Sequence, residues 1–83
     1  MVKEIKILGT GCPNCIRLEN NVKLALEKSG IDAKITKVTD IAKIMEYGIM
    51  STPGLVFDDE VVSFGRVIEP DDIIKLLEEK NDN

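Results

Sequence analysis

Residues 9–15 read Gly-Thr-Gly-Cys-Pro-Asn-Cys, and the patterns on either side of this stretch decide the fold. Before it, apolar and charged residues alternate over residues 4–8, which predicts a strand with one buried face. After it, apolar residues recur at spacings of three and four over residues 16–29, which indicates an amphipathic helix. Pro13 suits the first turn of that helix, and Gly30 suits its end. The two cysteines therefore lie where a strand passes into a helix.

Strands and helices continue to alternate along the rest of the chain. We expect a second strand over residues 31–38 and a short helix over residues 41–47. Two short strands, at residues 55–57 and 61–64, flank an acidic turn and are typical of a hairpin. Pro70 opens a last helix, whose first turn carries two aspartates that suit the positive end of the helix dipole.

This order, β-α-β-α-β-β-α, predicts an α/β fold. A strand-helix-strand unit requires a parallel pair with a right-handed crossover, whereas the later hairpin requires antiparallel pairing. A four-stranded mixed sheet with helices on both faces satisfies both requirements. Because the chain has 83 residues, we expect a single domain, residues 1–83, with a small core.

The composition excludes several kinds of chemistry. With no His, the chain has no Ser-His-Asp triad, no Cys-His pair and no imidazole base. Its two Cys fall short of the four ligands that a tetrahedral zinc site usually takes. The net charge of −4 argues against nucleic acid and anionic membranes as partners.

The role of the cysteine pair also depends on whether its cellular compartment is reducing or oxidising. The first residues lack the apolar segment of a signal peptide, and no apolar run reaches the ~18–20 residues that span a bilayer. We therefore expect a cytoplasmic protein. In a reducing cytosol, two cysteines are more often catalytic or metal-binding than a structural bridge.

The two cysteines occupy unequal positions on the expected helix. Cys12 lies at its N-terminus, where unpaired N–H groups and the helix dipole stabilise a thiolate. Cys15 lies one turn further in, at a spacing that allows a disulfide with little backbone movement. This asymmetry assigns Cys12 as the thiolate that attacks a disulfide and Cys15 as the shielded thiol that resolves the mixed disulfide. Pro13 keeps the loop geometry between them.

Two other interpretations of the pair stay open on these residues alone. The cysteines could pack in the core, since free Cys is often buried. They could also form a soft-metal module for Cu(I) or Zn(II), because small β-α-β domains that carry Cu(I) place Cys-x-x-Cys after a first strand. Near the motif, Glu19 lies four residues after Cys15 and within reach along the helix, although a surface acid is the favoured interpretation.

A second motif adds a family resemblance. The motif Cys12-Pro13-Asn14-Cys15 follows the first strand, and Thr52-Pro53 precedes the third strand, a hairpin and a final helix. This combination resembles the thioredoxin/glutaredoxin superfamily, and in particular the small archaeal and bacterial thioredoxin-like proteins called redox-active disulfide proteins. The resemblance covers nearly the whole chain.

The resemblance implies a thioredoxin-like fold and a thiol–disulfide oxidoreductase with Cys12 and Cys15 as its catalytic pair. It implies no bound cofactor and no metal. It further implies that the Thr52–Pro53 bond is cis, that Pro53 lies against the disulfide, and that the Thr52 backbone pairs with a substrate segment like an added strand. Thr52, Pro53 and Pro13 are then the substrate-binding residues. A trans turn at Pro53 is the alternative, since most X-Pro bonds are trans.

The resemblance also indicates the partners. We expect a disulfide-containing protein as substrate, a reductase or another dithiol as the source of electrons, and a monomer. Glutathione is a poor candidate, because the Gly-Gly and Asp-Asp pattern of glutaredoxins is only approximated over residues 65–72. A soft-metal module would have no use for a cis proline beside its cysteines, so Pro53 favours the oxidoreductase.

The chain departs from the thioredoxin pattern at two positions near the motif. Gly11 stands where thioredoxins carry Trp. Lys6 stands where they carry a buried Asp that accepts the proton of the resolving thiol. Proton transfer from Cys15 is therefore expected to use water or another group.

Overall fold

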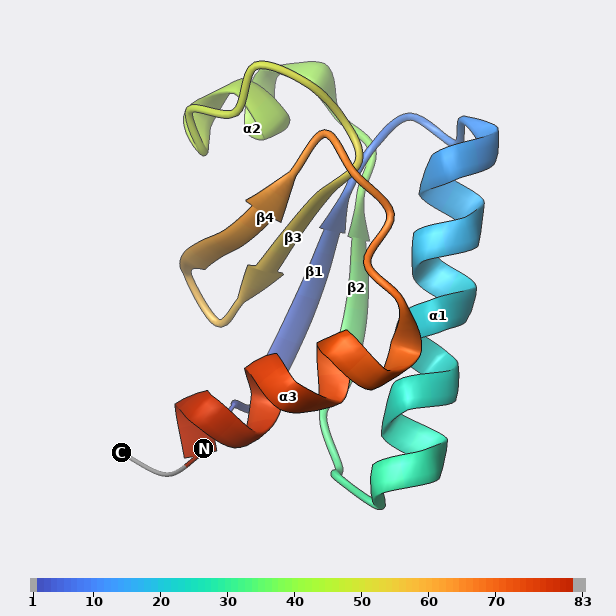
Figure 1. Ribbon diagram of the computed structural model, residues 1–83. Coiled ribbons are helices and arrows are strands. Elements are labelled where there is room, and N and C mark those ends of the chain that lie inside the picture. The colour runs from blue at the N-terminus through green and yellow to red at the C-terminus, as the bar shows by residue number, and fades with distance from the viewer. Residues whose placement is uncertain (1, 82–83) are drawn as a thin grey trace.

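The computed structural model describes residues 2–81, which form one sheet with helices packed on both of its faces (Figure 1). None of the helices in this range is long and apolar enough to cross a membrane. The elements are β1 (Glu4–Leu8), α1 (Pro13–Ser29), β2 (Lys34–Val38), α2 (Ile41–Glu46), β3 (Gly54–Phe57), β4 (Glu60–Phe64) and α3 (Pro70–Asn81).

The sheet is mixed, and its strand order is β2-β1-β3-β4. β1 pairs with β2 in parallel and with β3 in antiparallel orientation, and β4 adds to β3 in antiparallel orientation. These directions confirm the predicted α/β fold with a four-stranded mixed sheet. β1 is paired along both of its edges, so it is fixed more firmly than the outer strands β2 and β4.

The core is divided between the two faces of the sheet, because successive side chains of a strand point to opposite faces. On one face, α1 and α3 cover the inward side chains of β1 and β3. On the other face, Leu8 and Val56 pack against Ile44 of α2. The larger core includes Ile5, Ile7, Leu18, Val22, Ala25, Leu55, Phe57, Ile73 and Leu77.

The second strand begins later than the sequence pattern predicts. β2 starts at Lys34 and not at residue 31, because β1 starts only at Glu4, which pairs with Lys34. The Lys34 N–H donates to the Lys3 carbonyl at 2.9 Å, and this bond is the first between the two segments. Ile31 and Ala33 still pack against the core, but from a loop. Because both residues are apolar, the sequence pattern predicted a longer strand.

The hairpin turn is also tighter than expected. β4 begins at Glu60, which pairs with Phe57, so only Asp58 and Asp59 form the turn. Asp58 has a φ of 57°, in the left-handed region that Asp tolerates better than most residues. Its carboxylate accepts the backbone N–H groups of Lys3 and Glu4, each at 3.1 Å. The turn is thereby fastened to the start of β1.

We expect the buried face of α1 to dominate the stability of the fold. Leu18 is fully buried, and Leu18→Ala should lower the free energy of unfolding by about 2–5 kcal/mol through lost contacts and a cavity. Leu24 is 45% exposed on the same helix, and Leu24→Ala is the matched control, with an expected change of less than about 1 kcal/mol. Urea unfolding of both variants checks this; equal losses would contradict the packing described here.

Candidate functional site

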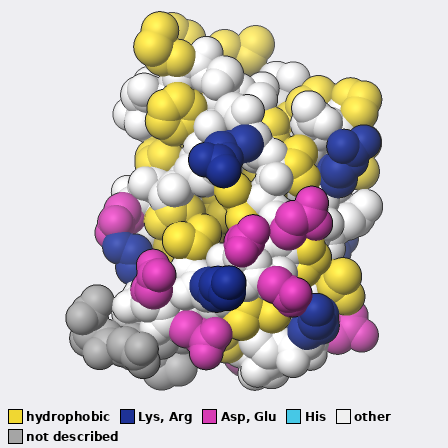
Figure 2. All heavy atoms as spheres, viewed as in Figure 1, with side chains coloured by type: hydrophobic (Ala, Val, Ile, Leu, Met, Phe, Trp, Pro, Cys, Tyr) yellow, Lys and Arg dark blue, Asp and Glu magenta, His cyan; other side chains and the backbone are white. Residues whose placement is uncertain are grey.

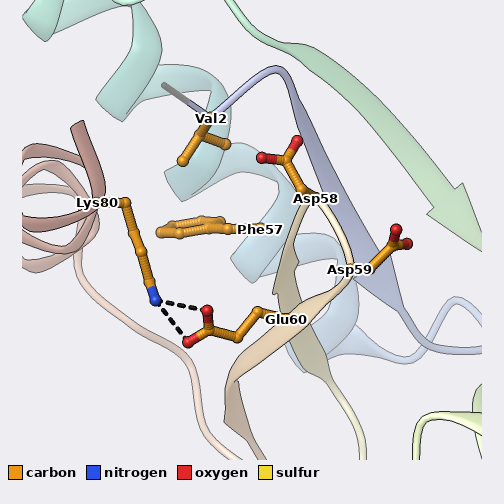
Figure 3. A pocket seen from close by; sticks show the side chains of 6 residues that line it. All are labelled: Val2, Phe57, Asp58, Asp59, Glu60 and Lys80. Carbon is orange, nitrogen blue, oxygen red and sulfur yellow. Dashed lines mark hydrogen bonds and ion pairs between the residues drawn. The ribbon is translucent and has the colours of Figure 1, made fainter. Parts of the chain in front are cut away.

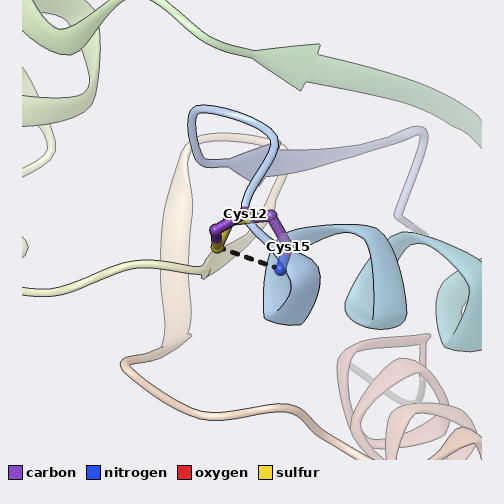
Figure 4. Close-up of a disulfide and its surroundings, with 2 residues drawn as sticks. All are labelled: Cys12 and Cys15. Carbon is purple, nitrogen blue, oxygen red and sulfur yellow. Dashed lines mark hydrogen bonds between the residues drawn. A yellow bond between two sulfur atoms is a disulfide. The ribbon is translucent and has the colours of Figure 1, made fainter.

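The two cysteines stand where β1 gives way to α1, and they form a disulfide (Figure 4). Cys12 is the N-cap of α1, with an extended backbone at φ −66° and ψ 162°. Its sulfur accepts the backbone N–H of Cys15 at 3.2 Å, and its carbonyl accepts the N–H of Ile16 at 3.0 Å. Pro13 follows in the first turn, where its missing N–H costs nothing. The first turn of the helix is thus built around the Cys12 sulfur.

The two sulfurs differ in exposure. Cys15 is only 5% exposed, because α1 lays its first turn against the sheet, whereas Cys12 is partly exposed. Their Cα atoms are 5.0 Å apart, within the normal range for a disulfide. The pair therefore presents one sulfur to solvent and keeps the other behind it.

Gly9 is a site residue that the sequence pattern did not identify. A Cβ atom added to Gly9 would overlap the Cys15 sulfur and would lie 3.1 Å from the Cys15 Cβ. The Gly9 N–H also donates to the Val38 carbonyl at 3.0 Å, so the backbone at Gly9 cannot retreat without losing a bond to β2. The sequence marked Gly9 only as the residue that ends a strand. The signal that could have identified Gly9 is a glycine at a strand end, six residues before Cys15. Glycine has no side chain, so its backbone can lie close to another group.

The Thr52–Pro53 segment lies at the same end of the sheet. The Thr52–Pro53 bond is cis, Pro53 is buried and Thr52 is exposed. Because Leu8 pairs with Gly54, the next residues along each strand, Gly9 and Pro53, lie side by side. The structure thus brings Pro53 next to the glycine that contacts Cys15.

Strand β4 holds this segment in place. The Pro53 carbonyl accepts the Gly65 N–H at 2.9 Å. Gly65 has a φ of 75°, and a Cβ added there would overlap the Ser51 hydroxyl. The end of β4 is therefore packed directly on the loop that carries Thr52.

The sequence matches the model of the family described as "Thioredoxin domain" over residues 3–78. The chain belongs to the thioredoxin domain family. It is 48% identical over 69 residues to a thioredoxin of Methanocaldococcus jannaschii, covering 83% of this chain and 79% of that protein. It is 42% identical over 74 residues to a thioredoxin of Methanothermobacter thermautotrophicus, covering 89% of this chain and 96% of that protein. These matches confirm the expected thioredoxin-like superfamily, and with the disulfide they support thiol–disulfide oxidoreductase chemistry in general.

Within this thioredoxin domain, Lys6 has a structural environment of its own. Its ammonium donates to the Tyr47 hydroxyl at 3.1 Å and to the Asp59 carboxylate at 3.0 Å. These two partners, Tyr47 first, hold the pKa of Lys6 well above its ordinary value. Lys6 lies on the α2 face of the sheet, opposite Ile7, and Asp59 lies in the β3–β4 turn. Lys6 is therefore a permanently charged group directed away from the cysteines.

A small pocket of about 90 Å³ opens beside Cys15 on the α1 face. Its lining includes Gly9, Cys15, Ile16, Glu19 and Lys37. The side chain of Glu19 is only 16% exposed, and its carboxylate pairs with Lys23 at 3.1 Å and with Lys37 at 3.8 Å. Glu19 is thus half-buried and ion-paired, whereas the sequence favoured a surface acid.

A larger pocket, of about 380 Å³, lies near the β3–β4 turn and the C-terminal end of α3 (Figure 3). Phe57 forms one wall, and the Lys80 ammonium reaches across to the Glu60 carboxylate at 2.6 Å. The Asp58 carboxylate is engaged by backbone N–H groups. Asp59 pairs with Lys6, so each charged side chain that lines this pocket already has a partner within the described residues.

Some exposed apolar side chains belong to segments that adjoin the cysteines or the Thr52–Pro53 loop. Met50 is 94% exposed in the loop before Thr52, and Phe64, at the end of β4, is about half exposed. Ile16 is similarly exposed in the first turn of α1, next to Cys15. In Figure 2, hydrophobic side chains are exposed at the end that carries α2, whereas charged side chains gather over α3. Exposed apolar side chains that lie together are typical of a surface that contacts another protein.

Gly9→Ala should destabilise the oxidised protein. The added methyl group would overlap the Cys15 sulfur, and overpacking of this kind costs about 1–3 kcal/mol. Thr10→Ala, at the exposed next residue, is the control and should change the free energy of unfolding by less than about 0.5 kcal/mol. Denaturant unfolding under oxidising conditions measures both; a Gly9→Ala protein as stable as the parent would show that the contact is loose.

Proposed function

We propose that this chain is a thiol–disulfide oxidoreductase that exchanges the Cys12–Cys15 dithiol with disulfides of proteins or small molecules. The observation that carries the proposal is the unequal placement of the two sulfurs. Cys12 is the partly exposed N-cap of α1 and accepts a backbone N–H, whereas Cys15 is buried one turn behind it. A nucleophile needs access and charge stabilisation, and a resolving thiol needs proximity to the mixed disulfide.

The reaction divides into two exchanges. The Cys12 thiolate attacks one sulfur of the substrate disulfide, a Cys12–substrate bond forms, and the other substrate sulfur leaves as a thiolate. Deprotonated Cys15 then attacks the Cys12 sulfur, the Cys12–Cys15 bond forms, and the second substrate sulfur leaves. The substrate gains two electrons and the dithiol loses two. A reductase or another dithiol returns them, and no bound cofactor takes part.

Substrate binding is assigned to the rim of the site. Thr52 is exposed beside buried Pro53, so its backbone is placed to pair with an extended substrate segment, as in strand addition. We assign Pro13, which is exposed in the first turn of α1, to the same binding surface. The exposed Met50 and Phe64 favour a protein disulfide over glutathione, because apolar contacts of that extent suit a polypeptide. We further propose that residues 1–83 act as one domain and as a monomer in the cytoplasm.

The two cysteine variants should behave differently toward a protein disulfide such as that of insulin. Cys15→Ser should accumulate a covalent adduct through Cys12, because no thiol remains to release it. Cys12→Ser should form little adduct, since Cys15 is 5% exposed. Mass spectrometry under non-reducing conditions distinguishes the two, and the parent protein should reduce insulin with turnover. A parent pair that fails to cycle and instead binds Cu(I) or Zn(II) tightly would favour the soft-metal alternative.

The thiol of Cys12 should have a pKa below the free value of ~8.5, because the helix N-terminus stabilises the thiolate. The Cys15→Ser variant isolates this thiol, and its thiolate absorbance as a function of pH gives the value. Cys12→Ser is the matched control, in which only the buried thiol titrates. A Cys12 value at or above ~8.5 would contradict the role assigned to it.

A further inference from the structure

The proposed exchange leaves one proton without an acceptor. Cys15 must become a thiolate before it attacks Cys12, yet it is only 5% exposed and does not lie at the helix terminus. A buried thiol cannot pass its proton directly to bulk water, so a nearby group has to take it. Lys6 is not that group, because its ammonium is charged and faces the other side of the sheet.

The pocket beside Cys15 contains a suitable base. Cys15 and Glu19 both line it, and four residues along a helix bring two side chains onto the same face. The volume of about 90 Å³ is enough for water molecules, which need polar partners to occupy such a space. Glu19, Lys37 and Thr39 line the pocket and carry polar groups of the kind that bind water. The pocket therefore has room for water between the Cys15 thiol and the Glu19 side chain.

Two lysines hold the carboxylate in position. From α1, the Lys23 ammonium lies 3.1 Å from a Glu19 oxygen. From β2, Lys37 lies 3.8 Å from the other oxygen. Glu19, Lys23 and Lys37 are the charged groups that face one another here. The Glu19 side chain is therefore held between α1 and β2, and only 16% of it is exposed. A solvated surface acid would be more exposed.

We propose that Glu19 accepts the proton of the Cys15 thiol through water in this pocket and so enables Cys15 to resolve the mixed disulfide. The S–H bond of Cys15 breaks as the carboxylate takes the proton, the Cys12–Cys15 bond forms, and the Cys12–substrate bond breaks. The departing substrate thiolate then takes a proton from Glu19 or from solvent. The inference rests on the proposed oxidoreductase function and adds a proton acceptor to it.

The test separates the two exchanges in one reaction. The reduced full-length protein is mixed with excess dithiobis(nitrobenzoate), an aromatic disulfide whose thiolate product is coloured. The first release reports attack by Cys12 and depends on reagent concentration, whereas the second reports resolution by Cys15 and does not. Absence of the first release would mean that the proposed function fails. A normal first release lets the role of Glu19 be judged independently.

We expect Glu19→Gln to leave the first release unchanged and to slow the second by at least about tenfold near pH 7, within the range for loss of a general base. Below that pH the Glu19→Gln rate should fall by about tenfold for each pH unit, whereas the parent rate should flatten. Glu27→Gln, an exposed acid on the same helix, is the matched control and should behave like the parent.

Glu19→Asp, which keeps a carboxylate in the pocket, should regain the flattened profile. A merely structural role for Glu19 would not give this dependence on pH. Equal second releases in the parent and Glu19→Gln would overturn the proposal. A faster second release in Glu19→Gln would also overturn it, because the carboxylate would then act only by opposing the thiolate charge.

Discussion

The pairing of β1 along both edges is the constraint on which the rest of the structure depends. Because β2 and β3 fix β1 from either side, the end of β1 at Leu8 lies beside the start of β3 at Gly54, and the chain passes from that end into α1. Gly9 continues the pairing with β2 for one residue beyond the strand and faces Pro53 across the β3 edge. The cysteine motif, the cis proline segment and the Glu19 pocket all gather at this one end of a central strand.

The sequence was most informative where structure is decided by nearby residues. Alternation over residues 4–8 and the apolar spacing along 16–29 predicted β1 and α1, and the position of the cysteines between them followed directly. The cis geometry at Pro53 came from the family resemblance and not from physics, since the residues alone favour a trans bond. The start of β2 was misjudged because apolar Ile31 and Ala33 pack in a loop, and only the length of β1 reveals where pairing can begin.

The features that the sequence did not reveal are those set by distant partners. Glu19 pairs with Lys37, which lies on β2, so the local pattern of α1 could not distinguish it from an ordinary surface acid. The contact between Gly9 and Cys15 likewise depends on how α1 docks on the sheet. Lys6 stood out as a departure from the thioredoxin pattern, but its partners, Tyr47 and Asp59, come from α2 and the β3–β4 turn. Each case joins segments that only the folded sheet brings together.

The proposed exchange makes opposite demands on the two sulfurs, and one helix offers both environments. In that exchange Cys12 acts as a thiolate, and the N-cap position with its N–H donor favours this form. Cys15 has to remain a thiol until a mixed disulfide exists, and burial favours the neutral form of a thiol. Glu19, which lines the pocket beside Cys15, is the acceptor that we propose for its proton. Because the side chains of β1 alternate between the two faces of the sheet, Lys6 lies on the α2 face, whereas the proposed acceptor lies on the α1 face with Cys15.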